Sequence, residues 1–78
     1  MITALQCKMA RAATGWGVRE LAAKADVSAS TVNRFERGGA EPHSSTLRAI
    51  RQTFEAAGIE FIPGGARLRE QAAEAQAS

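Results

Sequence analysis

The stretch "ADVSASTVNRFERGG", residues 25–39, decides the fold of this chain. Val32 and Phe35 are three positions apart, which is the spacing of one buried face of a helix. Ser28 is a favoured N-cap residue, and two glycines at the end of the stretch are a typical helix stop. The pattern therefore predicts a short helix that starts after Ser28, buries one face and ends at Gly38.

The two faces of this predicted helix differ in chemistry. At about 100° per residue, Val32 and Phe35 fall on one side. The other side carries short side chains at its start and long hydrogen-bonding ones behind them: Ala29, Ser30, Asn33, Arg34 and Arg37. A slim N-terminal end followed by long polar groups suits a helix that enters the major groove of DNA. The pattern alone also allows a surface helix of a small bundle.

A second short helix is predicted just before it, in "VRELAAKA", residues 18–25. Its apolar residues form one stripe, and its N-cap position falls on Gly17, a weaker cap than Ser or Thr. Two short helices joined by three or four residues form a helix-turn-helix.

Two further helices are predicted to complete the core. "TALQ" at 3–6 has the form of a capping box and starts a helix over 4–13, with Leu5, Met9 and Ala12 on its apolar face. A fourth helix opens at 43–45 and ends at Gly58, with Ala57 among its inward positions. The expected core side chains are Leu5, Met9, Trp16, Leu21, Val32, Phe35, Leu47, Ile50 and Phe54.

The remaining residues predict a small C-terminal appendage. "IEFI" and "ARLR", on either side of a "PGG" turn, suggest a hairpin of 59–62 with 66–69. We therefore expect a helix-turn-helix domain over 1–58 and a strand or hairpin over 59–69 that supplies a dimer contact. The alternative is that this segment folds back over its own fourth helix. Residues 70–78 are expected to be frayed or disordered.

Composition excludes several classes of protein. Seventy-eight residues with 45% hydrophobic content make one globular domain. The lone Cys7, expected to be buried or half-buried, cannot form an internal disulfide, and the distant His43 gives it no metal-binding partner. No apolar run is long enough for a membrane span and none resembles a signal peptide, so we expect a cytoplasmic protein. We expect no cofactor, metal or small-molecule ligand.

Positive charge is concentrated in the first two thirds of the chain. Residues 1–51 carry eight Lys or Arg against four acids, whereas residues 52–78 carry two against four. A basic part beside a mildly acidic tail suits nucleic-acid binding. No catalytic site is predicted, because the adjacent His43, Ser44 and Ser45 cannot assemble a nucleophile, a base and an orienting acid. We therefore do not expect an enzyme.

Several motifs at matching separations resemble the Cro/repressor-like (XRE-family) helix-turn-helix transcriptional regulators. They are "ARAATGW", "VRELAAKADVS", "TVNRFERG", then Pro42 and "TLRAI", over roughly residues 3–57. The resemblance implies an all-α, compact four-helix domain, to which the short C-terminal hairpin or strand is added. It implies function less tightly, because one fold serves several functions.

The resemblance also implies roles for individual residues. Arg11 and Glu36 match a structural ion pair between the first and third helices. The positions that match base-reading residues are Ala29, Ser30, Asn33 and Arg34. The positions placed near DNA phosphates are Gly17, Val18, Arg19, Thr31, Arg37, Ser44 and Ser45, partly because helix N-termini offer free N–H groups.

Three departures from the family pattern bear on these roles. Asp26 stands where Gly is common, and Asp tolerates the left-handed conformation better than most residues. Val18 stands where many members carry a DNA-contacting Gln, and Ala29 offers only a methyl group. Direct reading of bases is therefore expected to depend mainly on Arg34 and Asn33.

The function expected from the sequence is sequence-specific binding of double-stranded DNA. The protein would regulate transcription as a homodimer on a palindromic operator, most simply as a repressor. The alternative is a protein-interaction module, such as an antitoxin or an antiactivator of a mobile element.

Overall fold

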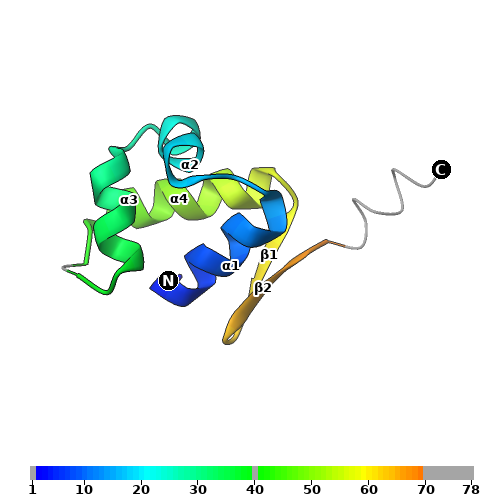
Figure 1. Ribbon diagram of the computed structural model, residues 1–78. Helices are drawn as coiled ribbons and strands as arrows, with labels where there is room; N and C mark the ends of the chain where they lie inside the picture. Colours follow the sequence, from blue (N-terminus) through cyan, green and yellow to red (C-terminus); the bar gives the residue numbers. More distant parts are fainter. Residues whose placement is uncertain (1, 40, 70–78) are drawn as a thin grey trace.

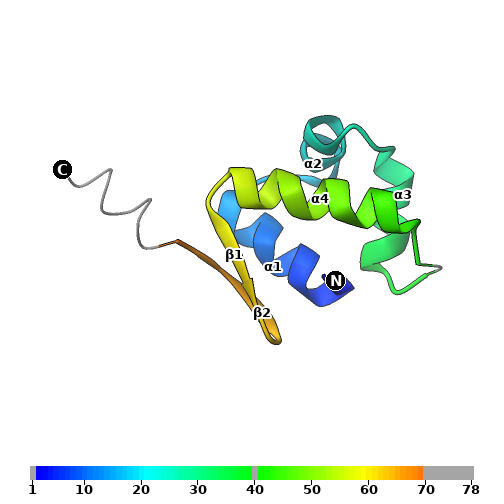
Figure 2. The ribbon, with the colours of Figure 1, turned by 180° about the vertical axis from the view of Figure 1, so that it is seen from behind.

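The computed structural model describes residues 2–39 and 41–69. Its element order is α1 (Ala4–Thr14), α2 (Val18–Ala25), α3 (Ala29–Glu36), α4 (Ser44–Ala56), β1 (Ile59–Ile62) and β2 (Gly65–Leu68). Helix α3 lies at one end and the hairpin lies beside α1 at the other, in both views (Figures 1 and 2). The fold is therefore mostly helical with a two-stranded sheet, rather than strictly all-α. The expectation for 70–78 lies outside the described residues.

Local sequence signals explain where the first three helices begin. The capping box at α1 is confirmed, since the Thr3 side chain accepts from the Gln6 backbone and the Gln6 side chain accepts from the Thr3 backbone. Ser28 caps α3 by accepting from the Thr31 backbone N–H. Gly17 is the N-cap of α2, as predicted, and provides no side-chain bond.

The turn between α2 and α3 depends on Asp26. Its φ of 58° is left-handed, and its backbone N–H donates to the carbonyls of Ala22 and Ala23. A short polar side chain tolerates this conformation better than most others. The chain can therefore turn sharply after Ala25, and Ser28 can start α3 only two residues after Asp26.

The hairpin forms one residue earlier on its second strand than the sequence suggested. Pro63 and Gly64 alone make the turn, with Gly64 at φ 73°, because proline suits the first central turn position and glycine the second. Gly65 therefore belongs to β2 and pairs with Ile62, while Leu68 pairs with Ile59.

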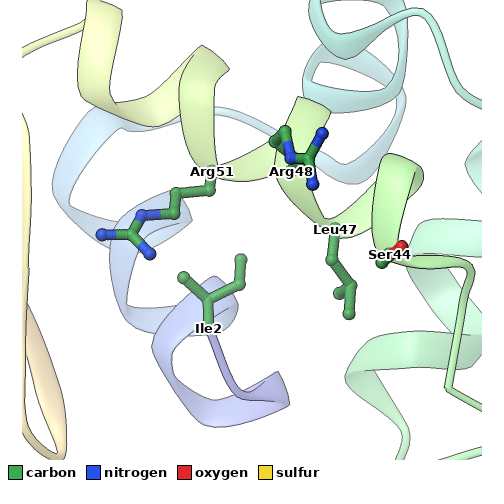
Figure 3. A pocket seen from close by; sticks show the side chains of 5 residues that line it. All are labelled: Ile2, Ser44, Leu47, Arg48 and Arg51. Carbon is green, nitrogen blue, oxygen red and sulfur yellow. The ribbon is translucent and has the colours of Figure 1, made fainter.

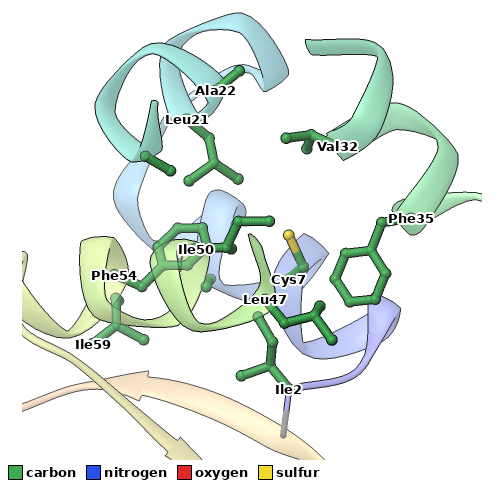
Figure 4. Close-up of a cluster of buried hydrophobic side chains, with 12 residues drawn as sticks. Ile2, Cys7, Leu21, Ala22, Val32, Phe35, Leu47, Ile50, Phe54 and Ile59 are labelled. Atoms are coloured by element: carbon green, nitrogen blue, oxygen red, sulfur yellow. The ribbon is translucent and has the colours of Figure 1, made fainter. Parts of the chain in front are cut away.

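The core lies between the helices and is closed by the first strand (Figure 4). Its fully buried large side chains include Leu21, Val32, Leu47, Ile50, Phe54 and Ile59. Trp16 is half-buried and stacks on Phe54, with ring centroids 5.4 Å apart, while the Lys24 ammonium lies 5.1 Å from the Trp16 ring. Each fully buried aliphatic or aromatic side chain contributes about 1.5–3 kcal/mol relative to an exposed one.

The prediction for the buried face of α1 was wrong. Leu5 is 60% exposed, Met9 is 38% exposed and Ala12 is also exposed. The side chains that α1 buries are Gln6, Cys7 and Ala10, together with Ile2 just before it. Helix α1 contacts α3 and the hairpin, and the apolar side chains that it buries, Cys7 and Ala10, are small. Ala57, expected to point inward, is exposed beyond the end of α4.

Gln6 ties the hairpin to α1. Its Nε2 donates to the carbonyl oxygens of Ile62 (2.8 Å) and Gly65 (3.2 Å), on both sides of the turn. The side chain of Ile59 is buried against α4, and Phe61 meets Phe54 edge-on. Within one chain, the hairpin therefore folds back on its own domain, which was the alternative for residues 59–69. It contacts α1 as well as α4.

Candidate nucleic-acid interface

Helix α3 separates apolar and polar residues as the sequence predicted. Val32 is completely buried and Phe35 is 6% exposed, whereas Ser30, Asn33 and Arg34 are exposed. The packed face holds the helix on the domain by burial of apolar area. The polar face is therefore free to meet a ligand, and its hydrogen-bonding groups are amide, hydroxyl and guanidinium.

Ala29 differs from the other three residues that match base-reading positions. It is half-buried at the first position of α3 and packs against the core. Val18, at the matching first position of α2, is also half-buried against the core. Both side chains thus contribute to packing, and the polar groups available for base edges are those of Ser30, Asn33 and Arg34.

Hydroxyl groups organise the start of α3. The Ser28 Oγ lies 2.6 Å from the Thr31 Oγ1 and 3.3 Å from the Ser30 Oγ. It also accepts from the Thr31 backbone N–H at 3.1 Å. Thr31 is half-buried, so its hydroxyl is held toward the cap. The cap thus satisfies a backbone N–H in the first turn of α3, where the side chains of Ala29 and Ser30 are short.

The starts of α2 and α4 differ from those of α1 and α3. Neither Gly17 nor His43, their N-cap residues, makes a side-chain capping bond. Backbone N–H groups in the first turn of such a helix lack an intrahelical partner and favour an anion. Gly17, Ser44 and Ser45 are all exposed. The two helix starts can therefore accept phosphate oxygens without a particular side chain.

Three arginines of the predicted interface are exposed and unpaired by acids. Within the described residues, Arg19, Arg34 and Arg37 have no carboxylate oxygen within 4.0 Å, whereas Arg51 and Arg67 are paired with Glu55 and Glu60. An unpaired guanidinium keeps its donors free for phosphate or for a base edge. The cationic groups of α2 and α3 are thus available to a polyanion.

Arg48 is a basic residue that the sequence analysis did not assign. With Ile2, Ser44, Leu47 and Arg51, it lines a small hollow beside α4 (Figure 3). It is exposed one helical turn after Ser44. Its position four residues after the predicted helix start could have identified it from the sequence. Arg48 extends the positive charge near the beginning of α4.

A buried cluster fixes α3 against α1. Arg11 donates from Nε to Glu36 Oε2 (2.7 Å) and from a terminal nitrogen to Glu36 Oε1 (2.6 Å). The Cys7 thiol donates to Glu36 Oε2, and a further Arg11 nitrogen donates to the Trp16 carbonyl. The Glu36 side chain is only 6% exposed. The ion pair that the family resemblance implied is therefore formed, and it sets the position of α3.

The same cluster shifts the ionisation of its members. Burial by itself would raise the pKa of Glu36, but hydrogen bonds from Arg11 and Cys7 and the charges of Arg11 and Lys8 lower it below its usual value. The hydrogen bond to Glu36 raises the pKa of Arg11. Burial, followed by the contact with Glu36, raises the pKa of the Cys7 thiol strongly. Glu36 is thus charged and Cys7 is an unreactive thiol at neutral pH.

Residues 2–39 and 41–69 contain neither a membrane-spanning helix nor a cluster of metal-binding side chains. No helix there has the length and apolarity needed to cross a membrane. In the same ranges, no three His, Cys, Asp or Glu side chains are grouped so that they could hold a metal ion.

Comparison with known proteins points to one family. The family described as helix-turn-helix domain matches residues 4–61, from the start of α1 into β1. That family is typical of XRE-like DNA-binding regulators. No curated protein matches the chain significantly.

Proposed function

The chain belongs to the helix-turn-helix domain family, and we propose that it is a sequence-specific regulator of transcription that binds double-stranded DNA through α3. The observation that carries the proposal is the division of α3 into a buried face and an exposed polar face. The proposal includes a cytoplasmic location, where the protein would meet its DNA.

Base reading in this proposal rests on Arg34, Asn33 and Ser30. A guanidinium can donate to guanine O6 and N7 together, and a carboxamide can pair with adenine N6 and N7. Ser30 lies nearer the narrow start of the helix and can donate or accept. Ala29 contributes at most a methyl contact with thymine, because its side chain is partly buried.

Phosphate contacts position the helix in the groove. The uncapped starts of α2 and α4 offer backbone N–H groups beside Gly17, Ser44 and Ser45. Arg19 and Arg37 add charge without an acid within reach in the described part of the chain. Such contacts provide affinity and orientation but little sequence information.

Few base readers imply that two copies bind together. One small module discriminates too weakly to find a single site in a genome, whereas two modules on related half-sites combine their specificity. Half-sites one helical turn of DNA apart would give a palindromic operator. Occupation of a promoter by this dimer would block transcription, so repression is the mode that we propose.

The proposed dimer contact is the hairpin segment 59–69 together with α1. The large exposed apolar side chains of the described residues are Leu5, Met9 and Leu68, all on α1 or β2. The methyl group of Met9 lies against Gly65, so α1 and β2 form one continuous surface. A hairpin also leaves a strand edge that a second chain can pair with.

Titration of ¹⁵N-labelled protein with a duplex tests the DNA-binding surface. Amide shifts should change at Ser30, Asn33 and Arg34 and at the starts of α2 and α4. Shifts confined to α1 and the hairpin, or none at millimolar DNA, would contradict the proposal. That second result would favour the protein-interaction module, for which the surface of Leu5, Met9 and Leu68 is the available contact.

A further inference from the structure

The end of α3 has a defined capping geometry. Gly38 adopts φ 79°, its N–H donates to the Phe35 carbonyl at 3.1 Å, and the Gly39 N–H donates to the Arg34 carbonyl at 2.9 Å. These two bonds are those of a Schellman motif, in which the residue after the left-handed one lies against the third residue from the helix end. Here the motif places Gly39 against Arg34.

The two adjacent glycines are required for different reasons. Gly38 needs its left-handed φ, and a Cβ added there would meet no atom within 4 Å. Gly39 has no left-handed φ, but a Cβ added there would lie 2.7 Å from Arg34 Cγ and 3.0 Å from the Arg34 carbonyl oxygen. Gly39 is therefore required for space, and the space is occupied by the stem of Arg34.

The absence of a Cβ at Gly39 permits the observed direction of the Arg34 side chain. The position of Cγ is set by χ1, and helical residues have essentially two χ1 rotamers available. A Cβ on residue 39 would exclude the observed position of Cγ, so the side chain would swing to the other rotamer. In its observed rotamer Arg34 lines a hollow together with Glu41, Pro42 and His43.

We infer that Gly39 determines base specificity by leaving the space that the DNA-reading rotamer of Arg34 occupies. This inference rests on the proposed function, in which Arg34 contacts a base edge. A bidentate contact with guanine requires both guanidinium donors at hydrogen-bond distance, and a functional side chain must be held within about 0.5 Å. Gly39 is thus a positioning residue that acts through Arg34.

The first measurement needs no DNA. The χ1 angle of Arg34 is measured by three-bond couplings in the free protein and in the Gly39→Ala variant, alongside a thermal melt. The variant should keep its fold, because residue 39 needs no left-handed φ and its contact with the Arg34 carbonyl oxygen, 3.0 Å, requires the main chain to move by only a few tenths of an ångström. Arg34 should change rotamer, because the 2.7 Å approach to its Cγ cannot be kept. An unchanged Arg34 rotamer in the folded variant would overturn the inference.

The second measurement is base preference, in a cycle with Arg34→Ala. Gly39→Ala should lower discrimination roughly tenfold at the base pair that Arg34 reads, and should change nothing further in the Arg34→Ala background. Arg37→Ala serves as the control and should weaken binding to all sequences about equally.

The possible outcomes distinguish the role of Gly39 from the proposed function of the protein. An undiminished preference in Gly39→Ala, or an equal loss in the Arg34→Ala background, would refute the role of Gly39 while leaving the proposed function intact. A wild-type protein with no base preference would refute the proposed function, and the specificity role of Gly39 with it, whatever the rotamer does.

Discussion

Replacement of Arg11 by methionine isolates the ion pair that joins α1 to the end of α3. The wild-type Glu36 carboxylate receives two hydrogen bonds from Arg11 and one from Cys7, and its side chain is 6% exposed. In the variant only the thiol remains as a donor. A nearly buried carboxylate would then have lost its salt-bridge partner, and of the charges that lower its pKa only that of Lys8 would remain.

The expected cost follows from this geometry. Removing one partner of a buried ion pair lowers the free energy of unfolding by about 3–5 kcal/mol. We expect a loss of about 3 kcal/mol here, because the Arg11 side chain is 24% exposed. A domain of this size loses roughly 4–8 °C of melting temperature per kcal/mol, so Arg11→Met should melt roughly 12–24 °C lower. Glu36→Gln should also melt lower, and the double variant should be more stable than the sum of the two predicts.

The stability of Arg11→Met should change with pH in the direction opposite to that of the wild-type protein. In the wild type the lowered pKa of Glu36 stabilises the fold above about 4.5, its ordinary value, and this stability is lost as the pH falls through the folded pKa. Without Arg11, burial becomes the dominant influence and raises the pKa of Glu36. Arg11→Met should therefore gain stability as the pH falls from 7 toward 5, where the buried carboxyl takes up a proton.

Thermal melts followed by circular dichroism at pH 7 and pH 5 provide the assay. Arg51→Met is the matched control, because the Arg51–Glu55 pair is exposed and its loss should cost less than about 1 kcal/mol. An Arg11→Met protein that melts no lower than this control at pH 7 would show that the ion pair does not stabilise the fold. Strict additivity of the Arg11→Met and Glu36→Gln changes would show that the two side chains do not interact.

Three other changes test separate parts of the structure. Arg34→Ala should reduce discrimination at one base pair per half-site by roughly 1–3 kcal/mol, measured by competition among operator variants, while an equal loss on all sequences would make Arg34 a phosphate contact. Gln6→Met should lower the free energy of unfolding by about 1–3 kcal/mol and speed hydrogen exchange of the hairpin amides, because the Ile62 and Gly65 carbonyls lose their donor. Unchanged exchange would show that packing alone holds the hairpin. Leu68→Glu should leave the melting temperature of the monomer nearly unchanged but weaken dimerisation about tenfold in sedimentation; a dimer of wild-type strength would exclude β2 from the contact.

Much of the fold follows from local signals that do not depend on distant residues. The Thr3 capping box, the Ser28 cap and the left-handed Asp26 each act within a few residues, and their sequence interpretation is confirmed. The separation of Val32 and Phe35 from the polar face of α3 likewise depends only on helical periodicity. These signals place α1, α2 and α3 within a residue or two of their observed ends.

The errors occur where tertiary contacts decide. Leu5 and Met9 have helical spacing and large apolar side chains, yet the buried face of α1 belongs to Cys7 and Ala10, which are small enough to allow close approach. Gln6 is buried because the hairpin carbonyls accept from its amide, a contact between residues far apart in the sequence. Hydrophobic periodicity within one helix contains no information about such partners.

In the candidate site, too, some features follow from the local sequence and others depend on tertiary contacts. Exposure of Ser30, Asn33 and Arg34 could be read from the helical pattern, and the Arg11–Glu36 contact came from the family resemblance. The role of Gly39 could not be inferred from "RGG", because a glycine after a helix is most simply a cap. Two structural facts distinguish it from Gly38: its φ is not left-handed, and a Cβ added to it would lie 2.7 Å from Arg34 Cγ.

Selection of bound sequences from a random duplex pool, at a stated salt concentration, tests the central claim most directly. The account predicts enrichment of a palindrome whose half-sites are separated by about one turn of DNA, with at least one strongly preferred guanine in each half. The same selection with Arg34→Ala should lose that guanine while retaining the spacing. A pool that remains random, although the protein is folded and binds DNA in a salt-dependent manner, would contradict the claim that this chain reads a DNA sequence.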